Sequence, residues 1–420
     1  YIASSTKSFT ALAASILHER GELDLDAPLS RYLPRAELHE DLDPDAITLR
    51  DLLTHTHGIA GVGPIVFRTA YSGVHTHDQL VDLLPTHGPA ENGRAFRYSN
   101  VGYNIASLAM DATLDAPWKD VLAREIFGPL GMRSTTGYLS RIPRERLAMP
   151  YGVVPEGYVR RPYSKGDDNM HAAGGLVTTV ADAALWLRAN LNGGRLGGER
   201  ILDERAIAET HRKQAEQDAT FLGFERDGYG LGWVTGSYDG DTVLHHFGGF
   251  PGFHAHISFM PDHDLGVAVL VDSGSGARLA DAIARRAYDE LRSVPNLDSK
   301  WEAELASLAD AAAERRARVA ADLERRAARP QDLPHPRAAY VGAFANGELG
   351  TIEVSLSGDG ALRARIGRME SEVEVYDAEK NMLRVELTGG GTVMPVEFEE
   401  GEDRAVRLRW LGRVFERVPG

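Results

Sequence analysis

The first regular pattern of apolar positions lies at the amino end of the chain. Apolar side chains recur there at the i, i+3, i+4, i+7 spacing of a helix: Phe9, Leu12, Ala13, Ile16 and Leu17. The spacing predicts a helix over residues 4–20 with one buried stripe, and Gly21 ends it. Ser4 and Lys7 then share one helix face, because residues three apart are neighbours on a helix.

The middle of the chain changes from helical spacing to alternation. Short helical patterns occur at 48–55 and 100–113. From residue 229 the period is two, and the alternating segments are YGLGWV (229–234), DTVLHH (241–246), HAHISFM (254–260) and LGVAVLV (265–271). They predict successive antiparallel strands with turns at Asp239-Gly240 and Pro261-Asp262, followed by a helix at about 276–292.

The last third of the chain contains two further patterns. Residues 301–329 are rich in Ala, Glu and Arg and predict a helix, which Pro330 ends. Alternating apolar residues then flank a Ser-Gly-Asp-Gly turn at 357–360 and predict a β hairpin. We therefore predict three parts: a mixed domain at 1–295, a helical linker at 296–334 and a small β domain at 335–420.

Composition and charge narrow the classes of partner. The 420 residues carry a net charge of -15, which argues against nucleic acid or an anionic membrane as the main partner. The chain has no cysteine, so disulfides and thiolate chemistry are excluded. No apolar run approaches the roughly 18 residues that span a bilayer. The compartment, whether cytoplasmic, periplasmic or extracellular, and the oligomeric state stay open.

Lysine is rare in this chain. Only six of the 46 basic residues are lysines: Lys7, Lys119, Lys165, Lys213, Lys300 and Lys380. A desolvated lysine can lose its proton near neutral pH and arginine cannot, so Lys7 is a candidate base. A serine hydroxyl needs such a base before it becomes a good nucleophile.

Three short motifs contain candidate catalytic residues. Ser4-Ser5-Thr6-Lys7 is an S-x-x-K motif, Tyr98-Ser99-Asn100 is a Y-x-N at a loop-to-helix junction, and His246-Phe247-Gly248-Gly249 lies at a strand boundary. Each motif has a structural alternative. In these alternatives, Ser4 is a helix cap beside a solvated lysine, and Tyr98 is a half-buried core aromatic. Asn100 is a helix cap, and His246 is a structural histidine.

The three motifs in this order resemble the serine β-lactamase and penicillin-binding-protein superfamily, in particular its class C-like branch of β-lactamases, esterases and D-aminopeptidases. Framework segments over residues 1–290 are also similar: 22–26, 31–34, 47–56, 128–132 and 173–176. The resemblance implies an α+β fold in three α/β/α layers, an antiparallel sheet flanked by helices, with an all-α subdomain. The tail resembles a small, barrel-like β domain that is often appended to such hydrolases.

The resemblance also implies a role for each motif residue. Ser4 is the expected nucleophile, Lys7 its base and Tyr98 the proton shuttle, while Asn100 orients the substrate. The backbone N–H groups of Gly249 and Ser4 form the expected oxyanion hole, and Gly248 and His246 belong to the same substrate-binding strand. A free backbone N–H and the helix dipole at Ser4 favour a developing oxyanion. We expect a bacterial-type serine hydrolase without cofactor or metal, which acts through an acyl-enzyme on a small-molecule or short peptide substrate.

Two positions depart from the family pattern. His246 and Phe247 stand where many relatives carry a lysine and a hydroxyl residue that bind a substrate carboxylate. This departure favours an ester or peptide-amide substrate over penicillins. Relatives also carry a helix and strands before the nucleophile, whereas three residues precede Ser4, so we expect the sequence to be a fragment whose sheet edge is open.

Two other classes of function are open from the sequence. H-x-H pairs occur at 55–57, 75–77 and 254–256 and suggest a metal-dependent hydrolase, although none has a third ligand at a known spacing. A non-hydrolytic penicillin-binding or scaffold protein with the same fold is the other alternative.

Overall fold

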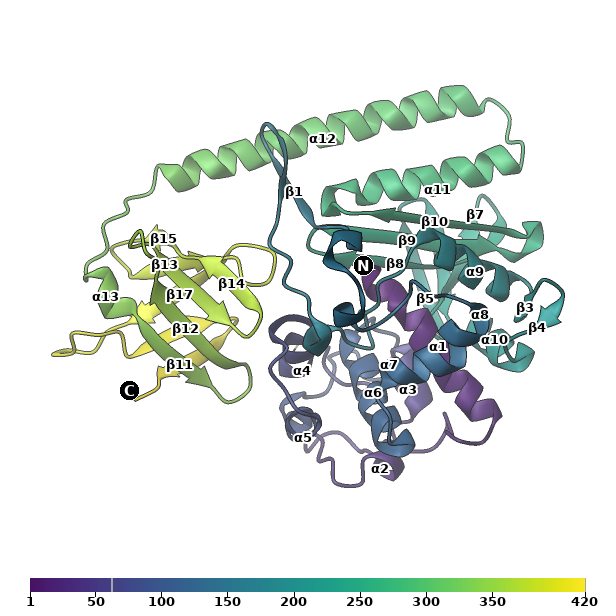
Figure 1. Ribbon diagram of the computed structural model, residues 1–420, viewed down its shortest axis with the longest axis horizontal. Coiled ribbons are helices and arrows are strands. Elements are labelled where there is room, and N and C mark those ends of the chain that lie inside the picture. Colours follow the sequence, from purple (N-terminus) through teal and green to yellow (C-terminus); the bar gives the residue numbers. More distant parts are fainter. Residues whose placement is uncertain (62, 420) are drawn as a thin grey trace.

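The computed structural model describes residues 1–61 and 63–419. The middle layer of its amino-terminal part is a six-stranded antiparallel sheet with the order β10-β9-β8-β7-β6-β5 (Figure 1). Its strands are β5 (Ala215–Phe221), β6 (Phe224–Tyr229), β7 (Val234–Tyr238), β8 (Asp241–Phe250), β9 (Phe253–Met260) and β10 (Leu265–Val271).

Helices cover both faces of this sheet. Alternate residues of β9 point to opposite faces, so Ala255, Ile257 and Phe259 join the main core with α1 (Thr6–Glu19) and α9 (Val180–Leu191). His256 and Ser258 face α11 (Ala277–Leu291) on the other side, where His256 bonds Asp281 and Ser258 bonds Tyr288. The expected three-layer α/β/α arrangement is therefore present.

The helix α1 lies in the interior of the molecule. Every residue from Thr6 to Leu17 is buried, so the expectation of a single buried stripe is wrong. Alanine, serine and threonine occupy the positions between the large apolar residues, and such small side chains allow neighbouring elements to approach from all sides. Ser15, for example, donates a hydrogen bond to the carbonyl of Ala206 in α10 (Glu204–His211).

A mostly helical region packs beside α1. Its helices are α2 (Leu29–Tyr32), α3 (Leu49–Thr54), α4 (Pro64–Phe67), α5 (His77–Asp82), α6 (Asn100–Leu114), α7 (Trp118–Leu122) and α8 (Gly128–Leu130). The predictions at 48–55 and 100–113 are confirmed by α3 and α6. Two short hairpins, β1 (Tyr151–Val154) with β2 (Gly157–Arg160) and β3 (Arg195–Leu196) with β4 (Glu199–Arg200), lie outside the main sheet.

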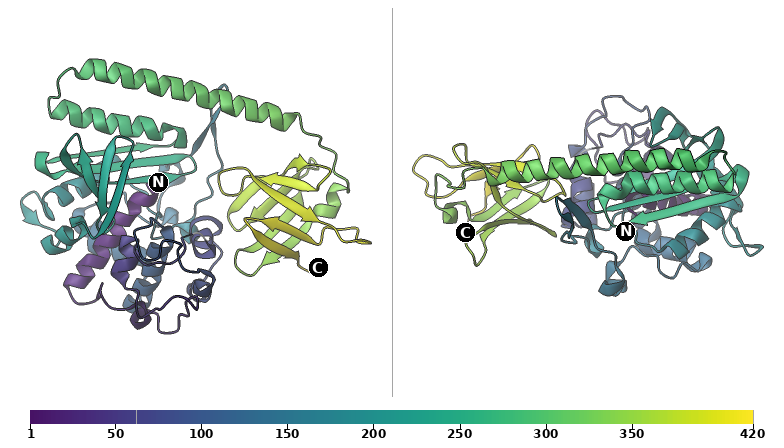
Figure 2. Two further views of the ribbon diagram at one scale, coloured as in Figure 1. Left: turned by 180° about the vertical axis from the view of Figure 1, so that it is seen from behind. Right: turned by 90° about the horizontal axis from the view of Figure 1, so that it is seen from above.

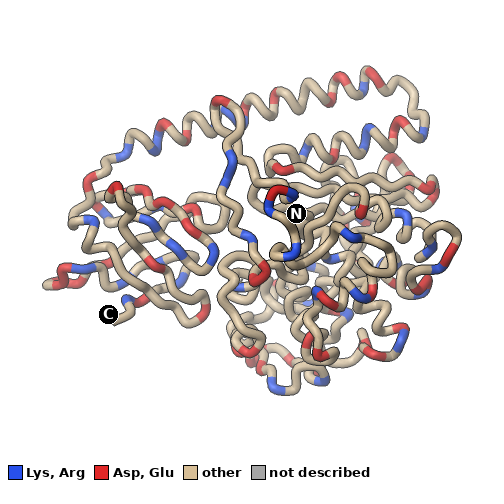
Figure 3. The backbone as a smooth tube through the Cα atoms, in the orientation of Figure 1, with Lys and Arg blue, Asp and Glu red and all other residues tan. Residues whose placement is uncertain are grey.

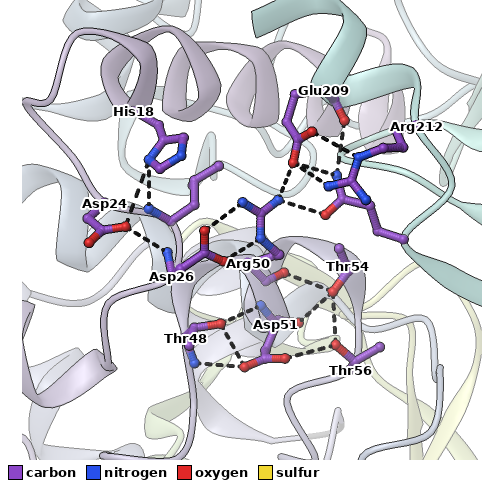
Figure 4. Close-up of polar contacts among 12 residues, drawn as sticks. His18, Asp24, Asp26, Thr48, Arg50, Asp51, Thr54, Thr56, Glu209 and Arg212 are labelled. Carbon is purple, nitrogen blue, oxygen red and sulfur yellow. Dashed lines mark hydrogen bonds and ion pairs between the residues drawn. The ribbon is translucent and has the colours of Figure 1, made fainter. Parts of the chain in front are cut away.

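A polar network fixes α3 against α10. Thr48 caps α3 through the amide of Asp51, and the Asp51 carboxylate accepts from the Thr48 amide in return (Figure 4). Arg50 binds Asp26 with its Nη2 2.9 Å from Oδ2 and also pairs with Glu209 of α10. The network therefore holds the first turn of α3 against α10.

The carboxyl-terminal part begins with the 31-residue helix α12 (Leu297–Ala327), which lies beside α11 and runs across the molecule (Figure 2). None of its residues is buried, and both acidic and basic residues are distributed along it (Figure 3). Pairs one turn apart, such as Glu314 with Arg318, support a helix of this kind.

A nine-stranded antiparallel sheet, barrel-like and nearly closed, forms the end of the chain. It follows the short helix α13 (Arg337–Tyr340), and its strands are β11 (Gly342–Asn346), β12 (Gly350–Leu356), β13 (Leu362–Ile366), β14 (Met369–Glu372), β15 (Glu374–Asp377), β16 (Met382–Val385), β17 (Thr392–Glu397), β18 (Arg407–Trp410) and β19 (Arg413–Arg417). The predicted hairpin is confirmed, because Leu356 of β12 pairs with Leu362 of β13.

The carboxyl-terminal sheet contacts the helical region. Phe67 of α4 packs in the apolar core of that sheet, with its ring centroid 5.6 Å from that of Trp410. The guanidinium of Arg68 donates to the backbone carbonyls of Gly347 and Glu348. These contacts join the two parts side by side.

The predictions for the main sheet are confirmed in part. The helix near 276–292 is α11, and the segments at 241–246, 254–260 and 265–271 lie in β8, β9 and β10. The single strand predicted at 229–234 is wrong, because β6 ends at Tyr229 and β7 starts at Val234. Between β6 and β7 the chain leaves the sheet, and Gly232 lies against α1. A Cβ atom on Gly232 would lie 2.6 Å from the Lys7 carbonyl oxygen. In the described part of the chain, no helix combines the length and the apolar character of a membrane span.

Candidate active site

Ser4 lies directly before α1, in the 3₁₀ turn η1 (Ala3–Ser5) rather than in the α-helix itself. Ala3 has a φ of 44°, in the left-handed region that non-glycine residues rarely adopt. Such backbone geometry is concentrated at functional sites. Ser4 is partly exposed, whereas Ser5 is fully buried and donates to the His246 carbonyl of β8 at 2.8 Å. That bond fixes η1 against the sheet.

The side chain of Lys7 is fully buried and points back to Ser4. Its Nζ lies 3.2 Å from Ser4 Oγ, 2.7 Å from Asn100 Oδ1 and 2.7 Å from the Ala173 carbonyl oxygen. None of these partners is a carboxylate. Burial therefore lowers the pKa of Lys7 well below its ordinary value of 10.5.

Tyr98 and Asn100 reach the same point from the start of α6. The Ser99 side chain caps α6 by accepting from the Val101 amide, so the cap is not Asn100. Tyr98 is 44% exposed, and Lys7 Nζ lies 4.8 Å from its ring centroid. Desolvation raises the pKa of Tyr98, while the Ser4 hydroxyl and the charge of Arg226 oppose the rise. The structure thus brings together Ser4, Lys7, Tyr98 and Asn100, which are up to 96 positions apart in the chain.

The β8 residues form the opposite side of the site. Gly248 packs on η1 so closely that a Cβ would collide with the Ile2 carbonyl oxygen and lie 3.2 Å from Ser4 N. Gly249 is exposed, and a Cβ there would meet no atom within 4 Å. A residue other than glycine at position 248 would therefore push β8 away from the serine.

His246 is buried at the edge of the same site. Its ring centroid lies 5.9 Å from that of Tyr98, and its Nε2 lies 3.2 Å from the Tyr229 hydroxyl. Burial and the charge of Lys7 lower the pKa of His246 well below its ordinary value of 6.5. The imidazole is therefore neutral near pH 7.

Phe247 does not face Ser4. Because neighbouring strand residues alternate, its side chain points to the α11 face and stacks on His245 and His256, with centroid distances of 4.4 and 4.5 Å. The sequence alone indicates only that position 247 lacks a hydroxyl side chain.

Sequence reasoning did not assign a role to the turn at 171–176. Its Ala173 carbonyl accepts from Lys7, and the Leu176 amide donates to Thr6 Oγ1 at 3.1 Å. In the sequence, residues 173–176 are only a segment that resembles the family. A backbone carbonyl leaves no side-chain signal in a sequence, so its contact with the lysine could not be predicted.

The role of His55 was also missed. His55 follows α3 with a left-handed φ of 62°, and its Nδ1 accepts from the Ser99 amide at 3.2 Å. Its ring centroid lies 4.6 Å from that of Tyr98. The signal was the Leu-Leu-Thr-His segment at 52–55, which ends α3 directly under the Y-x-N motif.

The histidine pairs are not arranged as a metal site. In residues 1–61 and 63–419, no group of three or more His, Cys, Asp or Glu side chains is placed to hold a metal ion. His55 is enclosed by aromatic rings, and His254 and His256 face Asp281 in a buried network behind the sheet.

The arrangement is suited to proton transfer from a hydroxyl. A neutral Lys7 amine at this distance can accept a proton from Ser4 Oγ, and Asn100 Oδ1 and the Ala173 carbonyl would stabilise the resulting positive charge. Ser4 N lies in the first turn of the helical segment, where backbone amides have no intrahelical partner. A developing oxyanion above Ser4 would meet that amide and the exposed Gly249.

Comparison with known proteins gives the family. Residues 1–291 match the family model described as Beta-lactamase, and the chain belongs to this family. Penicillin-binding protein 4* of Bacillus subtilis (strain 168) is 24% identical over 302 residues, which cover 68% of this chain. The match spans 63% of that relative's length.

Solved structures agree with this fold. The octameric penicillin-binding protein homologue from Pyrococcus abyssi has a TM-score of 0.60 at 21% identity, covering 99% of this chain and 87% of that one. The D-amino acid amidase from Ochrobactrum anthropi SV3, complexed with L-phenylalanine, has a TM-score of 0.57 at 26% identity, covering 70% of this chain and 83% of that one. The similarity to the Pyrococcus abyssi structure extends over the carboxyl-terminal sheet as well as the beta-lactamase part.

Proposed function

We propose that this chain is a serine hydrolase that cleaves ester or peptide-amide bonds through an acyl-enzyme, with Ser4 as the nucleophile. The observation that carries the proposal is the buried, carboxylate-free Lys7 amine 3.2 Å from Ser4 Oγ. A lysine in this setting is poised to be neutral and to act as a base.

In the proposed reaction, Ser4 Oγ attacks the substrate carbonyl while Lys7 takes its proton. The new oxyanion is held by the amides of Ser4 and Gly249. Tyr98, with its ring over Lys7, passes a proton to the leaving group and later assists the attacking water. Asn100 accepts from Lys7 through Oδ1, which leaves its NH₂ group for a substrate oxygen.

Two observations bear on the substrate. His246 is buried and neutral, so this position supplies no fixed cation for the carboxylate of a penicillin. The D-amino acid amidase is similar to this chain at 26% identity. Both favour esters and amides of amino acids as substrates, with β-lactams as the comparison class.

The test is hydrolysis of p-nitrophenyl esters, D-amino-acid amides and nitrocefin by the protein and by Ser4→Ala. Turnover of the preferred substrate should fall by about 10³-fold or more, because the proposed acyl intermediate forms on Ser4 Oγ. Ser8→Ala is the matched control, since Ser8 lies one turn further along α1 and donates to the Ser5 carbonyl. Retained turnover in Ser4→Ala would refute the proposal.

A non-hydrolytic binding protein of the same fold gives a different result. It would form a lasting adduct at Ser4 with an activated ester and release no product. The Tyr98 ring beside Lys7 favours turnover, because this phenol is the group that can activate a deacylating water.

A further inference from the structure

Two acceptors set the direction of the Lys7 amine. A neutral lysine amine has two N–H groups and one lone pair, and Asn100 Oδ1 and the Ala173 carbonyl oxygen each lie 2.7 Å from Nζ. Both oxygens accept hydrogen bonds and donate none, so they take the two N–H groups. The lone pair is then left for the Ser4 hydroxyl, 3.2 Å away. The aim of the base therefore depends on where the Ala173 carbonyl is held.

The Ala173 carbonyl belongs to a close-packed backbone turn at residues 171–176. Within this turn the Gly174 amide donates to the His171 carbonyl at 2.9 Å. At Gly175 a Cβ would lie 2.2 Å from His171 N, so a larger residue could enter only by moving the backbone. Because the turn is bonded and packed on itself, the contacts that hold it also place the Ala173 carbonyl.

Threonine side chains of α1 hold the turn from one side. Thr10 Oγ1 donates to the Ala172 carbonyl at 2.9 Å. Thr6 Oγ1 accepts from the Leu176 amide at 3.1 Å. Thr6 and Thr10 are both buried, and they lie on one face of the helix because they are four residues apart. The helix that carries the base thus also holds peptide groups on either side of its acceptor.

A side chain of α6 holds the turn from another side. Asn104 lies one turn after Asn100 on this helix, and its Oδ1 is 3.1 Å from His171 Nδ1. Burial lowers the pKa of His171 well below its ordinary value of 6.5, so the neutral ring donates its Nδ1–H to the amide oxygen. Within residues 1–61 and 63–419, Asn104 Nδ2 is buried without a partner. A half-satisfied buried amide is costly, which indicates that its bond to His171 has a task.

From these contacts we infer that Thr10 and Asn104 are positioning residues for the catalytic base. Each holds the 171–176 turn, and the turn presents the carbonyl that takes one N–H of Lys7. The inference rests on the proposed hydrolase function. In the described part of the chain neither side chain bonds to Lys7 or Ser4, so each acts through the turn. Loss of either contact should turn the lone pair away from the serine and slow acylation, while substrate binding stays nearly unchanged.

The first experiment removes the hydroxyl of Thr10. Single-turnover release of p-nitrophenol from a p-nitrophenyl ester measures the acylation rate and the half-saturating ester concentration separately. Thr10→Val keeps the branched shape of the side chain and should lower the acylation rate by about 10- to 100-fold, with little change in the half-saturating concentration. Thr10→Ser keeps the hydroxyl and should retain most of the rate. An equal loss in both variants would overturn the inference.

The second experiment removes the amide of Asn104. Asn104→Leu is similar in size and also removes the unpartnered Nδ2, so a slower acylation cannot be put down to an added buried polar group. We expect a loss of about 10- to 100-fold here as well. In the double variant Thr10→Val/Asn104→Leu the combined loss should be smaller than the product of the single losses, because both act through one turn. Losses that multiply in full would show independent effects and contradict the shared turn.

A control separates positioning from stability. Ser15 is also buried on α1, and its hydroxyl also donates to a backbone carbonyl, that of Ala206 at 3.0 Å, away from the turn. Ser15→Ala should lower the urea midpoint much as Thr10→Val does and leave the acylation rate unchanged. A normal rate in Thr10→Val, or an equal loss of rate in Ser15→Ala, would overturn the inference. If Ser4→Ala abolishes turnover while Thr10→Val keeps its rate, this inference fails and the proposed function stands.

Discussion

The amine of Lys7 lies 3.2 Å from the hydroxyl of Ser4, with no carboxylate among its hydrogen-bond partners. The pair therefore combines a nucleophile with a base whose pKa is lowered by burial. A base of this kind acts when it is unprotonated.

The pH profile should reflect this amine. The value of kcat/KM should rise with pH as Lys7 loses its proton, with a midpoint well below 10.5. Lys7→Arg keeps the charge but cannot lose the proton, so we expect a loss of about 10²–10⁴-fold. Lys213→Arg, at an exposed position, is the control. Near-normal activity in Lys7→Arg would exclude the base assignment.

Tyr98 should contribute to turnover more than to binding. Its ring lies over Lys7 and its hydroxyl adjoins Ser4, so Tyr98→Phe removes a proton path while the ring remains. We expect kcat to fall by about 10²-fold or more with little change in KM. Tyr158→Phe on the exposed hairpin strand β2 should change neither value. A change in KM alone would assign Tyr98 to substrate binding.

Two adjacent glycines should differ sharply in their tolerance of a side chain. Gly248→Ala places a methyl group against the Ile2 carbonyl, so the free energy of unfolding should fall by about 1–3 kcal/mol. Gly249→Ala places its methyl in open space and should change that energy by less than about 0.5 kcal/mol. Urea unfolding of both variants measures the difference, and equal effects would contradict the close packing of β8 on η1.

Lys165 should make stability depend on pH. Its Nζ donates to the carbonyls of Ala70 and Asn169 and lies 4.2 Å from the Phe250 ring centroid, and burial lowers its pKa to about 7. Between pH 7 and 10.5 the unfolded chain binds a proton that the folded chain lacks, so stability rises with pH across this window.

The contribution of Lys165 should reach up to about 1.4 kcal/mol per pH unit, so the rise should be smaller by that amount in Lys165→Met, in which the buried Lys7 still contributes. Urea unfolding at a series of pH values measures it. If the free energy of unfolding had the same pH dependence in the unchanged protein and in Lys165→Met, Lys165 would keep its proton when folded.

Much of this fold follows from local patterns in the sequence. The strands β8, β9 and β10 and the helix α11 were predicted because their apolar residues recur at fixed spacing. The burial of α1 on all sides could not be predicted in this way. It depends on which elements pack around its alanines and serines, and spacing within one helix does not specify that.

The candidate site could be predicted in part for a similar reason. Ser4, Lys7, Tyr98 and Asn100 lie in motifs with recognisable residue types, and the structure brings them together. The contact of Lys7 with the Ala173 carbonyl was not predicted. A backbone acceptor has no residue type of its own, so its place beside Lys7 is visible only once the chain is folded.

The central claim is that Ser4 carries the acyl group during turnover. Rapid-quench mass spectrometry of the protein with a slowly hydrolysed ester measures this directly. We predict a mass increase equal to the acyl group, located on the peptide that contains Ser4 and lost as product appears. An acyl group on another residue, or steady turnover with Ser4 never modified, would contradict the account.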